Sequence, residues 1–491
     1  MDDVLWSGVD VLSNGQDIAG LRKMVLVSVM RRHFQTGDAI VGLDSPSTLL
    51  AKLSSHDLST VADIAKGKTG IKDAKPGPYP LVVTAEARSE CDHFDYEGPA
   101  VLIPMVSSTG HGDASLKRIH YQEGQYAVGT ILAVVRPLNP SQLSARYLYE
   151  YLSAFKEELL VSRMVGTANV SLTVKKLGDV PVPMIPIASQ RQIERLMALC
   201  DRLEADQADA EAAHAQLVQA LLDSLTQATD AADFRASWQR LSEHFHALFT
   251  TEASIDGLKQ TVLQLAFSGR LTCGVVDVND MGSRDDELPA LPYGWRYARL
   301  GDVAKLINGD RGSNYPNRSE YVEQGLPFIN TGHINPDGSL DLDTMNYISR
   351  EKFDSLRSGK IERDDLVYCL RGATLGKTAF VAQFTEGAVA SSLVILRFNR
   401  DVSRRYAYYF LTSPIGRRWI RKFDNGSAQP NLAANSVKEY LMPIPPLAEQ
   451  HRIVAKVDEL IALCDQLKAQ LADARQQHAQ LATVLVEHAV A

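Results

Sequence analysis

The segment Val180-Pro-Val-Pro-Met-Ile-Pro-Ile-Ala-Ser-Gln190 decides how this chain is organised, because it occurs twice. The second copy is Tyr440-Leu-Met-Pro-Ile-Pro-Pro-Leu-Ala-Glu-Gln450. Pro183 pairs with Pro443, and subtraction of their numbers gives a separation of 260 residues. A repeat at a fixed separation indicates a duplicated structural unit.

The repeat extends in both directions from this segment. Downstream the separation grows from 260 to 264, and four extra residues are about one helical turn, so the insertion lengthens a helix without rotating its apolar face far. The further matching stretches are Leu58–Gly67 with Leu300–Gly309, Arg146–Leu152 with Arg405–Leu411, His214–Leu217 with His478–Leu481, and the shorter echo Ile18–Arg22 with Ile255–Lys259.

A heptad pattern follows each copy of the proline-rich segment, since apolar residues step by three and four. The seam residues are Cys200, Leu203, Ala210, His214, Leu217 and Leu221 in the first copy, and Val457, Leu460, Cys464, Leu467, Leu471, Ala474, His478, Leu481 and Leu485 in the second. Each helix, at roughly 38 residues, would be on the order of 55–60 Å long. Neither helix can bury its seam alone, so we expect the two to pack antiparallel. The seam histidines are expected to set register rather than to bind a metal.

The remaining parts carry short β-rich runs bounded by Gly, Pro and Asn. We therefore predict an α+β fold: two mixed domains in a pseudo-two-fold repeat, with largely antiparallel sheets, separated by two long antiparallel coiled-coil-like helices. The expected boundaries are an N-terminal helical segment at 1–52, mixed domains at 53–187 and 292–446, a central helical region at 188–291 and a C-terminal helix at 447–491.

Composition is that of a globular protein, with 45% apolar and 22% charged residues. The five cysteines lie far apart without zinc spacing, so we expect buried thiols, no metal and a reducing cytoplasm. The acidic N-terminus has no apolar segment after it, and no apolar run is long enough to span a membrane.

Charge is distributed unevenly along the chain, whose net charge is −8. Residues 292–440 hold 21 Lys and Arg against 16 Asp and Glu, whereas residues 181–291 hold 8 against 17. Phosphate attraction requires basic residues on the contacting face. The second mixed domain is therefore the better candidate for nucleic-acid contact, and the acidic central region suits protein docking.

Motifs for catalysis are incomplete. Gly372-Ala-Thr-Leu-Gly-Lys-Thr378 has three residues between its first glycine and the Gly-Lys pair, whereas a phosphate-binding loop needs four. The sequence contains no Asn/Asp-Pro-Pro-aromatic tetrad of an adenine methyltransferase and no HExxH zinc motif. These observations favour a recognition protein with no catalytic residues.

Polar and basic side chains beside glycine are the candidates for DNA contact, because glycine permits close backbone approach and these side chains match base edges or phosphates. In the first mixed domain they are Lys66, Lys68, Thr69, Ser108, His111, Lys117, Arg118 and Asn169. In the second they are Arg311, Asn314, Tyr315, Asn330, His333, Arg371, Thr374, Lys377, Ser427 and Gln429. The run Arg417–Lys422 is interpreted first as a solvated helix face and second as a phosphate clamp.

Several landmarks together resemble the specificity subunits of Type I restriction–modification systems. They are Trp295–Asn308, Arg371–Lys377, Gly426–Leu432, Pro443–Gln450 and the central Leu258–Leu271. In the first mixed domain, Ser107–Gly112 stands in place of the Arg-Gly loop, and Asn169-Val-Ser in place of Gln-Pro-Asn.

This resemblance implies two target-recognition domains that each read one half of a bipartite DNA sequence. It implies that the helices act as a ruler and dock two methyltransferase subunits, through which restriction subunits join. The chain itself would then be a non-catalytic subunit of a DNA adenine methyltransferase and site-specific deoxyribonuclease complex. It would carry no cofactor, since S-adenosylmethionine would belong to the methyltransferase partner.

Two alternatives remain open. The chain could be the specificity subunit of another restriction type, serving a fused methyltransferase–nuclease. It could also be an enzyme with an unrecognised site.

Overall fold

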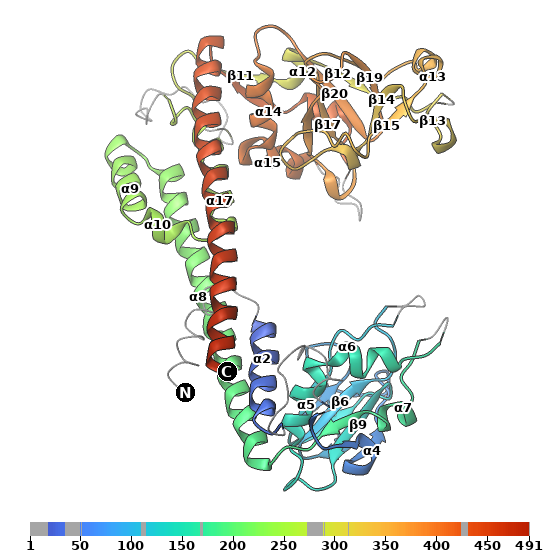
Figure 1. Cartoon of the computed structure of the whole chain (residues 1–491). Helices are drawn as coiled ribbons and strands as arrows, with labels where there is room; N and C mark the ends of the chain where they lie inside the picture. Colours follow the sequence, from blue (N-terminus) through green and yellow to red (C-terminus); the bar gives the residue numbers. More distant parts are fainter. Residues whose placement is uncertain are drawn as a thin grey trace. The chain divides into compact units, whose positions relative to one another are not determined.

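The computed structural model describes residues 18–34, 50, 52–109, 114–166, 170–272, 288, 290–312, 314–423 and 431–490. The chain divides into two compact units, Met1–Ala210 with Arg475–Ala491, and Glu211–Ala474 (Figure 1). Over the ranges given, no helix is both long enough and apolar enough to cross a membrane.

The first β-rich domain lies in unit 1. Its strands are β1 (Ser55–Asp57), β2 (Ala62–Lys66), β3 (Tyr79–Val82), β4 (Ser89–Cys91), β5 (Tyr96–Glu97), β6 (Ala100–Pro104), β7 (His120–Gln122), β8 (Gln125–Val128), β9 (Leu132–Pro137) and β10 (Pro181–Pro183). They form sheets of order β2-β9-β6-β7 and β4-β3-β8-β5, and the pair β1-β10. Its helices are α4 (Leu58–Val61), α5 (Ala145–Ala154), α6 (Lys156–Leu159), η1 (Val161–Arg163) and α7 (Val174–Gly178).

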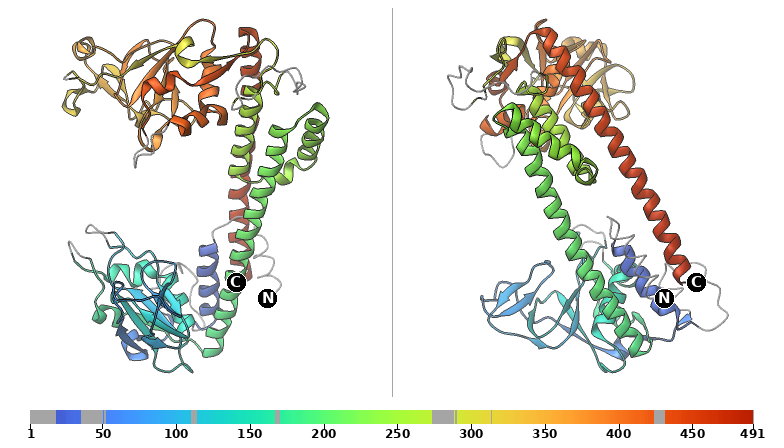
Figure 2. Two further views of the ribbon diagram at one scale, coloured as in Figure 1. Left: turned by 180° about the vertical axis from the view of Figure 1, so that it is seen from behind. Right: turned by 90° about the vertical axis from the view of Figure 1, so that its left-hand side faces the viewer.

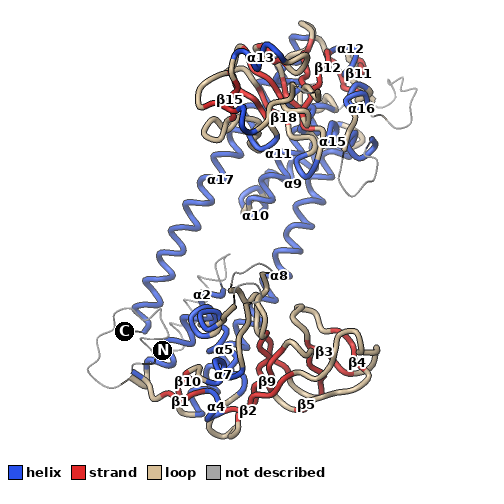
Figure 3. Tube along the Cα trace, turned by 90° about the vertical axis from the view of Figure 1, so that its right-hand side faces the viewer, coloured by secondary structure: helices blue, strands red, loops and turns tan. Residues whose placement is uncertain are grey.

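Strand β6 explains where the core of this domain sits. All five of its residues are buried, because successive side chains of a strand point to opposite faces and both faces are covered. Val101 and Ile103 join the core under α5, whereas Ala100 and Leu102 join a second cluster with Val128. Figure 3 shows the strands of this domain in red against its helices in blue.

The second β-rich domain lies in unit 2. Its strands are β11 (Arg296–Arg299), β12 (Ala304–Asn308), β13 (Tyr321–Val322), β14 (Leu326–Ile329), β15 (Asn346–Ile348), β16 (Lys360–Glu362), β17 (Leu366–Cys369), β18 (Thr378–Phe380), β19 (Glu386–Val389), β20 (Leu393–Phe398) and β21 (Leu441–Ile444). Its helices are α12 (Leu300–Val303), η3 (Arg318–Glu320), η4 (Thr331–His333), α13 (Arg350–Ser355), η5 (Gly372–Thr374), α14 (Arg404–Thr412), α15 (Pro414–Phe423) and α16 (Ala434–Lys438).

The two β-rich domains have the same topology. The order β12-β20-β17-β18 repeats β2-β9-β6-β7, and β15-β14-β19-β16 repeats β4-β3-β8-β5 with β13 added at the edge. In each domain one central pair, β3 with β8 and β14 with β19, is parallel, and the other pairs described are antiparallel. The predicted α+β class, the duplication and the largely antiparallel sheets are therefore confirmed.

In the part of the chain that the structure describes, two long helices and four shorter ones lie outside the β-rich domains. They are α2 (Ile18–Arg31), α8 (Ile187–Gln227), α9 (Ala231–Glu243), α10 (Phe245–Leu248), α11 (Glu252–Phe267) and α17 (Leu447–Val490). The 41 residues of α8 and the 44 of α17 slightly exceed the predicted length. Within unit 2, the last part of α8 and α17 run in opposite directions (Figure 2).

The short echo in the sequence corresponds to a short helix packed against the start of each long helix. In unit 1, Arg22 of α2 hydrogen-bonds Glu204 of α8 at 2.9 Å and also pairs with Asp201. In unit 2, Lys259 of α11 pairs with Asp465 of α17. Because Asp201 and Asp465 are themselves matched in the repeat, α2 and α11 occupy equivalent places.

The predicted seams are buried only in part. Cys200 joins the unit 1 core, and Val457 joins the unit 2 core with residues of α11. Farther along, Leu217 and Leu481 are each 53% exposed. The short helices and the domain cores bury the first part of each seam. Within unit 2, the last part of α8 and α17 also share an apolar cluster that contains Val218, Leu222 and the seam residue Cys464. His214, at a seam position, lies 3.2 Å from the Ala247 carbonyl oxygen.

A buried glutamine joins the first β-rich domain to α8. Gln190 is 0% exposed. Its side-chain oxygen accepts the backbone N–H of Ser144 at 2.8 Å, and its side-chain nitrogen donates to the carbonyl oxygens of Gln142 and Ile185, both at 2.8 Å. One side chain therefore satisfies three backbone groups from the loop before α5 and the proline-rich segment.

Gln450 makes the same contacts at the start of α17 and is also 0% exposed. Its partners are Ser403 N at 2.8 Å, Asp401 O at 2.9 Å and Pro445 O at 3.0 Å. A buried tyrosine supports each joint, since the Tyr147 hydroxyl donates to Pro183 O at 2.9 Å and the Tyr406 hydroxyl to Pro443 O at 2.8 Å. The prolines and glutamines that revealed the repeat are therefore the residues that attach each domain to its helix.

Replacing Gln450 with alanine should destabilise unit 2. The change leaves buried backbone groups without partners, and an unsatisfied buried group costs about 1–3 kcal/mol. Urea unfolding followed by circular dichroism should show a lower midpoint for Gln450→Ala. Gln466→Ala, on an exposed position of the same helix, should stay within about 0.5 kcal/mol of the parent. Equal midpoints for the two variants would contradict this role.

Candidate nucleic-acid interface

A close backbone approach places one predicted contact loop at the same position in each domain. A Cβ on Gly67 would lie 2.1 Å from the Gly129 carbonyl oxygen, and one on Gly309 would lie 2.4 Å from that of Ala390. Real side chains do not tolerate such distances, so both positions require glycine. The loops that begin at Gly67 and Gly309 therefore leave β2 and β12 at equivalent points.

Asp310 shapes the loop of the second domain. Its two carboxylate oxygens accept the backbone N–H groups of Gly312 at 2.9 Å and Arg357 at 2.8 Å. These bonds favour the charged form and lower the pKa of the Asp310 carboxyl below its usual value. Asp310 is 7% exposed, whereas the next residue, Arg311, is exposed. The buried carboxylate thus holds a turn that presents an arginine.

Arg371 lies near Arg311, although it comes from a different loop of the second domain. It forms an isolated antiparallel bridge with Asn431, and Leu432 N donates to Leu370 O at 2.9 Å. A cavity of ≈ 280 Å³ is lined by Asn308, Arg311, Arg371, Asn431, Leu432, Ala433, Ala434 and Asn435. The fold therefore brings two predicted residues, Arg311 and Arg371, to one cavity together with three asparagines. Guanidinium and amide groups are the side chains that read base edges.

Other predicted residues of the second domain make contacts that support these loops. Asn314 Nδ2 donates to Ser355 O at 2.8 Å, and the Tyr315 ring lies 5.6 Å from that of Phe328. The Lys377 ammonium donates to a backbone carbonyl at 3.2 Å.

Three further predicted residues, Asn330, His333 and Thr374, lie within or beside short 3₁₀ turns. His333 is 4% exposed and is held by Asn330, whose backbone N–H lies 3.2 Å from His333 Nδ1. Thr374 Oγ1 lies 3.3 Å from Cys369 Sγ. These side chains therefore contact other groups of the protein itself.

In the first domain, the exposed candidates are Lys66, Lys68, Ser108 and Lys117. The Lys68 ammonium lies 4.7 Å from the centre of the Tyr96 ring. Ser108 Oγ accepts the backbone N–H of Lys117 at 2.9 Å, which brings the two ends of their loop together.

Two candidates of the first domain already have protein partners. Arg118 pairs with Glu86 at 2.6 Å. Thr69 is 4% exposed, and its hydroxyl donates to Asp95 at 2.7 Å. Four other candidates, His111, Asn169, Ser427 and Gln429, lie outside the residues that the structure describes.

Comparison with known proteins shows which family the chain belongs to. The model of the Type I restriction modification DNA specificity domain matches residues 55–211 and 292–474. The chain belongs to this family of Type I specificity proteins. Because one family model matches twice, the duplication is visible at this level as well.

Individual relatives agree with the family match. The EcoAI specificity subunit of Escherichia coli is 29% identical over 372 residues, which cover 67% of this chain and 61% of that protein, so the match spans less than two thirds of the relative. The EcoEI specificity subunit of Escherichia coli is 28% identical over 424 residues, which cover 75% of this chain and 68% of that protein.

A solved structure supports the fold of this specificity protein. A chain from a study of complex assembly and conformational transition of the type I R-M system has a TM-score of 0.55 and 18% identity, and the match covers 89% of this chain and 98% of that one. At this identity the likeness concerns the fold.

Sequence reasoning missed three side chains at this interface. Asn431 and Asn435 line the cavity. Arg357 is exposed, and a Cβ on Gly312 would lie 2.4 Å from its Nη2 atom. Asn431 stood next to a predicted loop and could have been included. Nothing local marks Arg357, because it reaches the loop through the bond between its backbone and Asp310.

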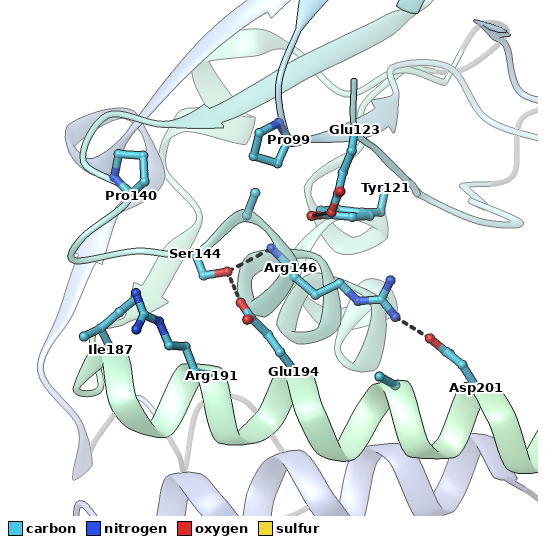
Figure 4. A pocket seen from close by; sticks show the side chains of 12 residues that line it. Pro99, Tyr121, Glu123, Pro140, Ser144, Arg146, Ile187, Arg191, Glu194 and Asp201 are labelled. Atoms are coloured by element: carbon cyan, nitrogen blue, oxygen red, sulfur yellow. Dashed lines mark hydrogen bonds and ion pairs between the residues drawn. The ribbon is translucent and has the colours of Figure 1, made fainter. Parts of the chain in front are cut away.

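A second cavity, of ≈ 410 Å³, lies in unit 1 between α5 and the start of α8 (Figure 4). Arg146 points across it and pairs with Asp201 at 2.9 Å and Glu150 at 2.8 Å, while the Ser144 hydroxyl donates to Glu194. The lining holds two arginines, Arg146 and Arg191, against three carboxylates, Glu123, Glu194 and Asp201, so the cavity has no excess of positive charge. We assign it to the joint between domain and helix.

Replacing Asp310 with asparagine should destabilise the Arg311 loop in a pH-dependent way. The folded pKa of Asp310 is lowered, so its charge contributes stability above the unfolded value of about 3.9, and this contribution is lost as pH falls through the folded pKa. Urea midpoints of parent and Asp310→Asn should differ at pH 7 and converge in acid. A difference that is constant over the whole pH range would contradict this explanation.

Proposed function

We propose that this chain reads a bipartite DNA sequence as the non-catalytic specificity subunit of a Type I restriction–modification complex. The observation that carries the proposal is the Arg311–Arg371 cavity in a domain that matches the DNA specificity family. Two guanidinium groups and three amides offer the donor and acceptor pattern that major-groove base edges complement. We assign Arg311 and Arg371 to base edges, and Ser427 and Gln429, on the neighbouring segment of the chain, to the same half-site.

The remaining candidates take different parts in this proposal. In the first domain, the exposed Lys66, Lys68 and Lys117 contact phosphates or bases of the other half-site. In the second, Asn314, Tyr315, Asn330, His333, Thr374 and Lys377 hold the loops in shape. Lysines supply sequence-independent affinity, whereas base contacts supply specificity.

The helical parts serve the assembly in this proposal. Residues 188–291 and 447–491 space the domains 53–187 and 292–446 and dock two methyltransferase subunits, through which restriction subunits join in the cytoplasm. The acidic balance of the central region supports a protein-docking role, because phosphates would repel it. S-adenosylmethionine would be bound by the methyltransferase partner.

Removing either arginine from the cavity should weaken the reading of one half-site. A bidentate arginine contributes about 1–3 kcal/mol of discrimination against the wrong base. With the reconstituted complex, binding to the cognate site and to sites with one altered base should be measured for Arg311→Ala and Arg371→Ala. We expect a loss on the cognate site and little further loss when the contacted base is also changed.

Arg350→Ala is the matched control, because this arginine pairs with Glu386 at 2.7 Å and does not line the cavity. It should leave discrimination unchanged. An equal loss on every DNA sequence would reassign the two arginines to phosphates, and no loss at all would refute the proposed contact.

A helical insertion tests the spacing role. The two long helices differ in the repeat by four residues, about one turn. Inserting four residues after Gln207 in α8 should change the length of DNA spacer that the complex accepts while both half-sites are still read. Mapping of methylated adenines in cells that carry the variant complex gives the spacer directly. An unchanged spacer with intact methylation would rule out the ruler.

A further inference from the structure

Three potential metal ligands meet at the end of β4 in the first β-rich domain. Cys91 Sγ lies 3.5 Å from His93 Nδ1 and 3.9 Å from Asp92 Oδ1, and His93 Nδ1 lies 2.7 Å from Asp92 Oδ1. All three atoms fall within 4.8 Å of one another. The three residues are consecutive in the sequence, so they do not match the spacing of a zinc-binding motif.

The distances suit a tetrahedral ion. Zinc binds sulfur at about 2.3 Å and imidazole nitrogen at about 2.0–2.1 Å, so two such ligands at a tetrahedral angle stand about 3.5 Å apart. Cys91 and His93 already have this separation. Cys91 Sγ also lies 4.0 Å from His93 Nε2, so the sulfur stands beside the imidazole ring rather than in line with the Nδ1 lone pair. For both to bind one ion, the hydrogen bond between His93 and Asp92 must open and the two side chains must turn toward each other. The side chains of His93 and Asp92 are about half exposed, at 51% and 46%.

The second ring nitrogen of His93, Nε2, already has a hydrogen-bond partner in the protein. His93 Nε2 lies 3.1 Å from Thr69 Oγ1, and the Thr69 hydroxyl donates to Asp95 at 2.7 Å. Asp95 in turn accepts the backbone N–H of Val128 at 3.1 Å. Histidines that bind metals commonly donate their second ring N–H to such a polar chain, which fixes the tautomer and leaves the first nitrogen free for the metal.

The second domain shows that the fold does not require this triplet. In the first domain Cys91 pairs with Tyr79 of β3, and in the second domain Ile348 pairs with Leu326 of β14. Because β3 and β14 are matching strands, Cys91 and Ile348 occupy equivalent positions. There the triplet reads Ile348-Ser-Arg350. An aliphatic residue satisfies the packing at this position, so the thiol, carboxylate and imidazole of the first domain are not needed for the sheet.

We propose that Cys91, Asp92 and His93 bind one Zn²⁺ ion, with solvent completing its coordination. Thiolate and imidazole favour zinc over magnesium or calcium. On binding, the Cys91 S–H bond breaks, its proton passes to solvent and the sulfur–zinc bond forms, with no change of oxidation state. Through His93 and Thr69 the ion ties the end of β4 to the loop that carries Lys66 and Lys68. Metal binding here is independent of the proposed DNA reading.

Co²⁺ is the probe for this site, because thiolate coordination gives it a charge-transfer absorption band. The reduced, metal-free full-length chain should bind one equivalent of Co²⁺ with this band, and Zn²⁺ should displace it. Cys91→Ser and His93→Gln should abolish the band. Cys369→Ser is the matched control, since Cys369 is likewise 0% exposed but lies in the other domain, and it should retain the band.

Thr69→Val tests the orienting chain, because it removes the hydroxyl and keeps the shape of the side chain. Affinity for Zn²⁺, measured by competition with a chelator, should fall about 10–100-fold. Because the His93 side chain is half exposed, His93→Gln should fold even if Cys91→Ser does not, and circular dichroism verifies this. Absence of the band in the parent chain, or its persistence in His93→Gln, would overturn the proposal.

Discussion

A buried amide fixes each β-rich domain to its long helix. Gln190 and Gln450 are completely excluded from solvent, and each satisfies three backbone groups, two in the loop before α5 or α14 and one in the proline-rich segment. Proline lacks an N–H group and cannot continue a hydrogen-bond ladder, so a segment rich in proline leaves carbonyl groups that need donors from elsewhere. Each glutamine amide donates to one such carbonyl, that of Ile185 or Pro445, and to a carbonyl of the loop before α5 or α14, so it ties the start of the long helix to the domain.

This joint explains why the long helices belong to the domain cores at their beginnings. Ile193 and Met197 of α8 lie in the same cluster as α2 and α5, and Ile453 and Val457 of α17 lie in the same cluster as α11 and α14. Each helix is therefore an extension of a folded domain rather than a flexible linker. Beyond those turns, seam residues of both helices within unit 2, Leu221 and Cys464 among them, pack in a further apolar cluster, whereas Leu217 is half exposed.

The repeat, the fold class and the two helices could be predicted because the residues that carry them are periodic or paired in the sequence. Pro183 with Pro443 and Gln190 with Gln450 needed only a comparison of the chain with itself. The interface could be predicted less completely. Arg311 and Arg371 stand in glycine-containing loops and were found, but the burial of Thr69 depends on Asp95, and the position of Arg357 depends on Asp310. Contacts between distant loops leave no local signal.

The two domains have the same strand topology but differ in the side chains at the candidate interface. Counting from the matched glycines Gly67 and Gly309, Thr69 stands where the second domain has Arg311. The bridge of Val106 with Ser171 corresponds to that of Arg371 with Asn431, so a valine replaces the second arginine. A sheet fixes where its loops emerge but not which side chains they carry. Two domains of one topology can therefore present different chemistry, as the proposed reading of two unlike half-sites requires. In the first domain the position of Arg311 is instead occupied by the threonine that orients His93, so the same exchange that removes an arginine completes the environment of the proposed metal site.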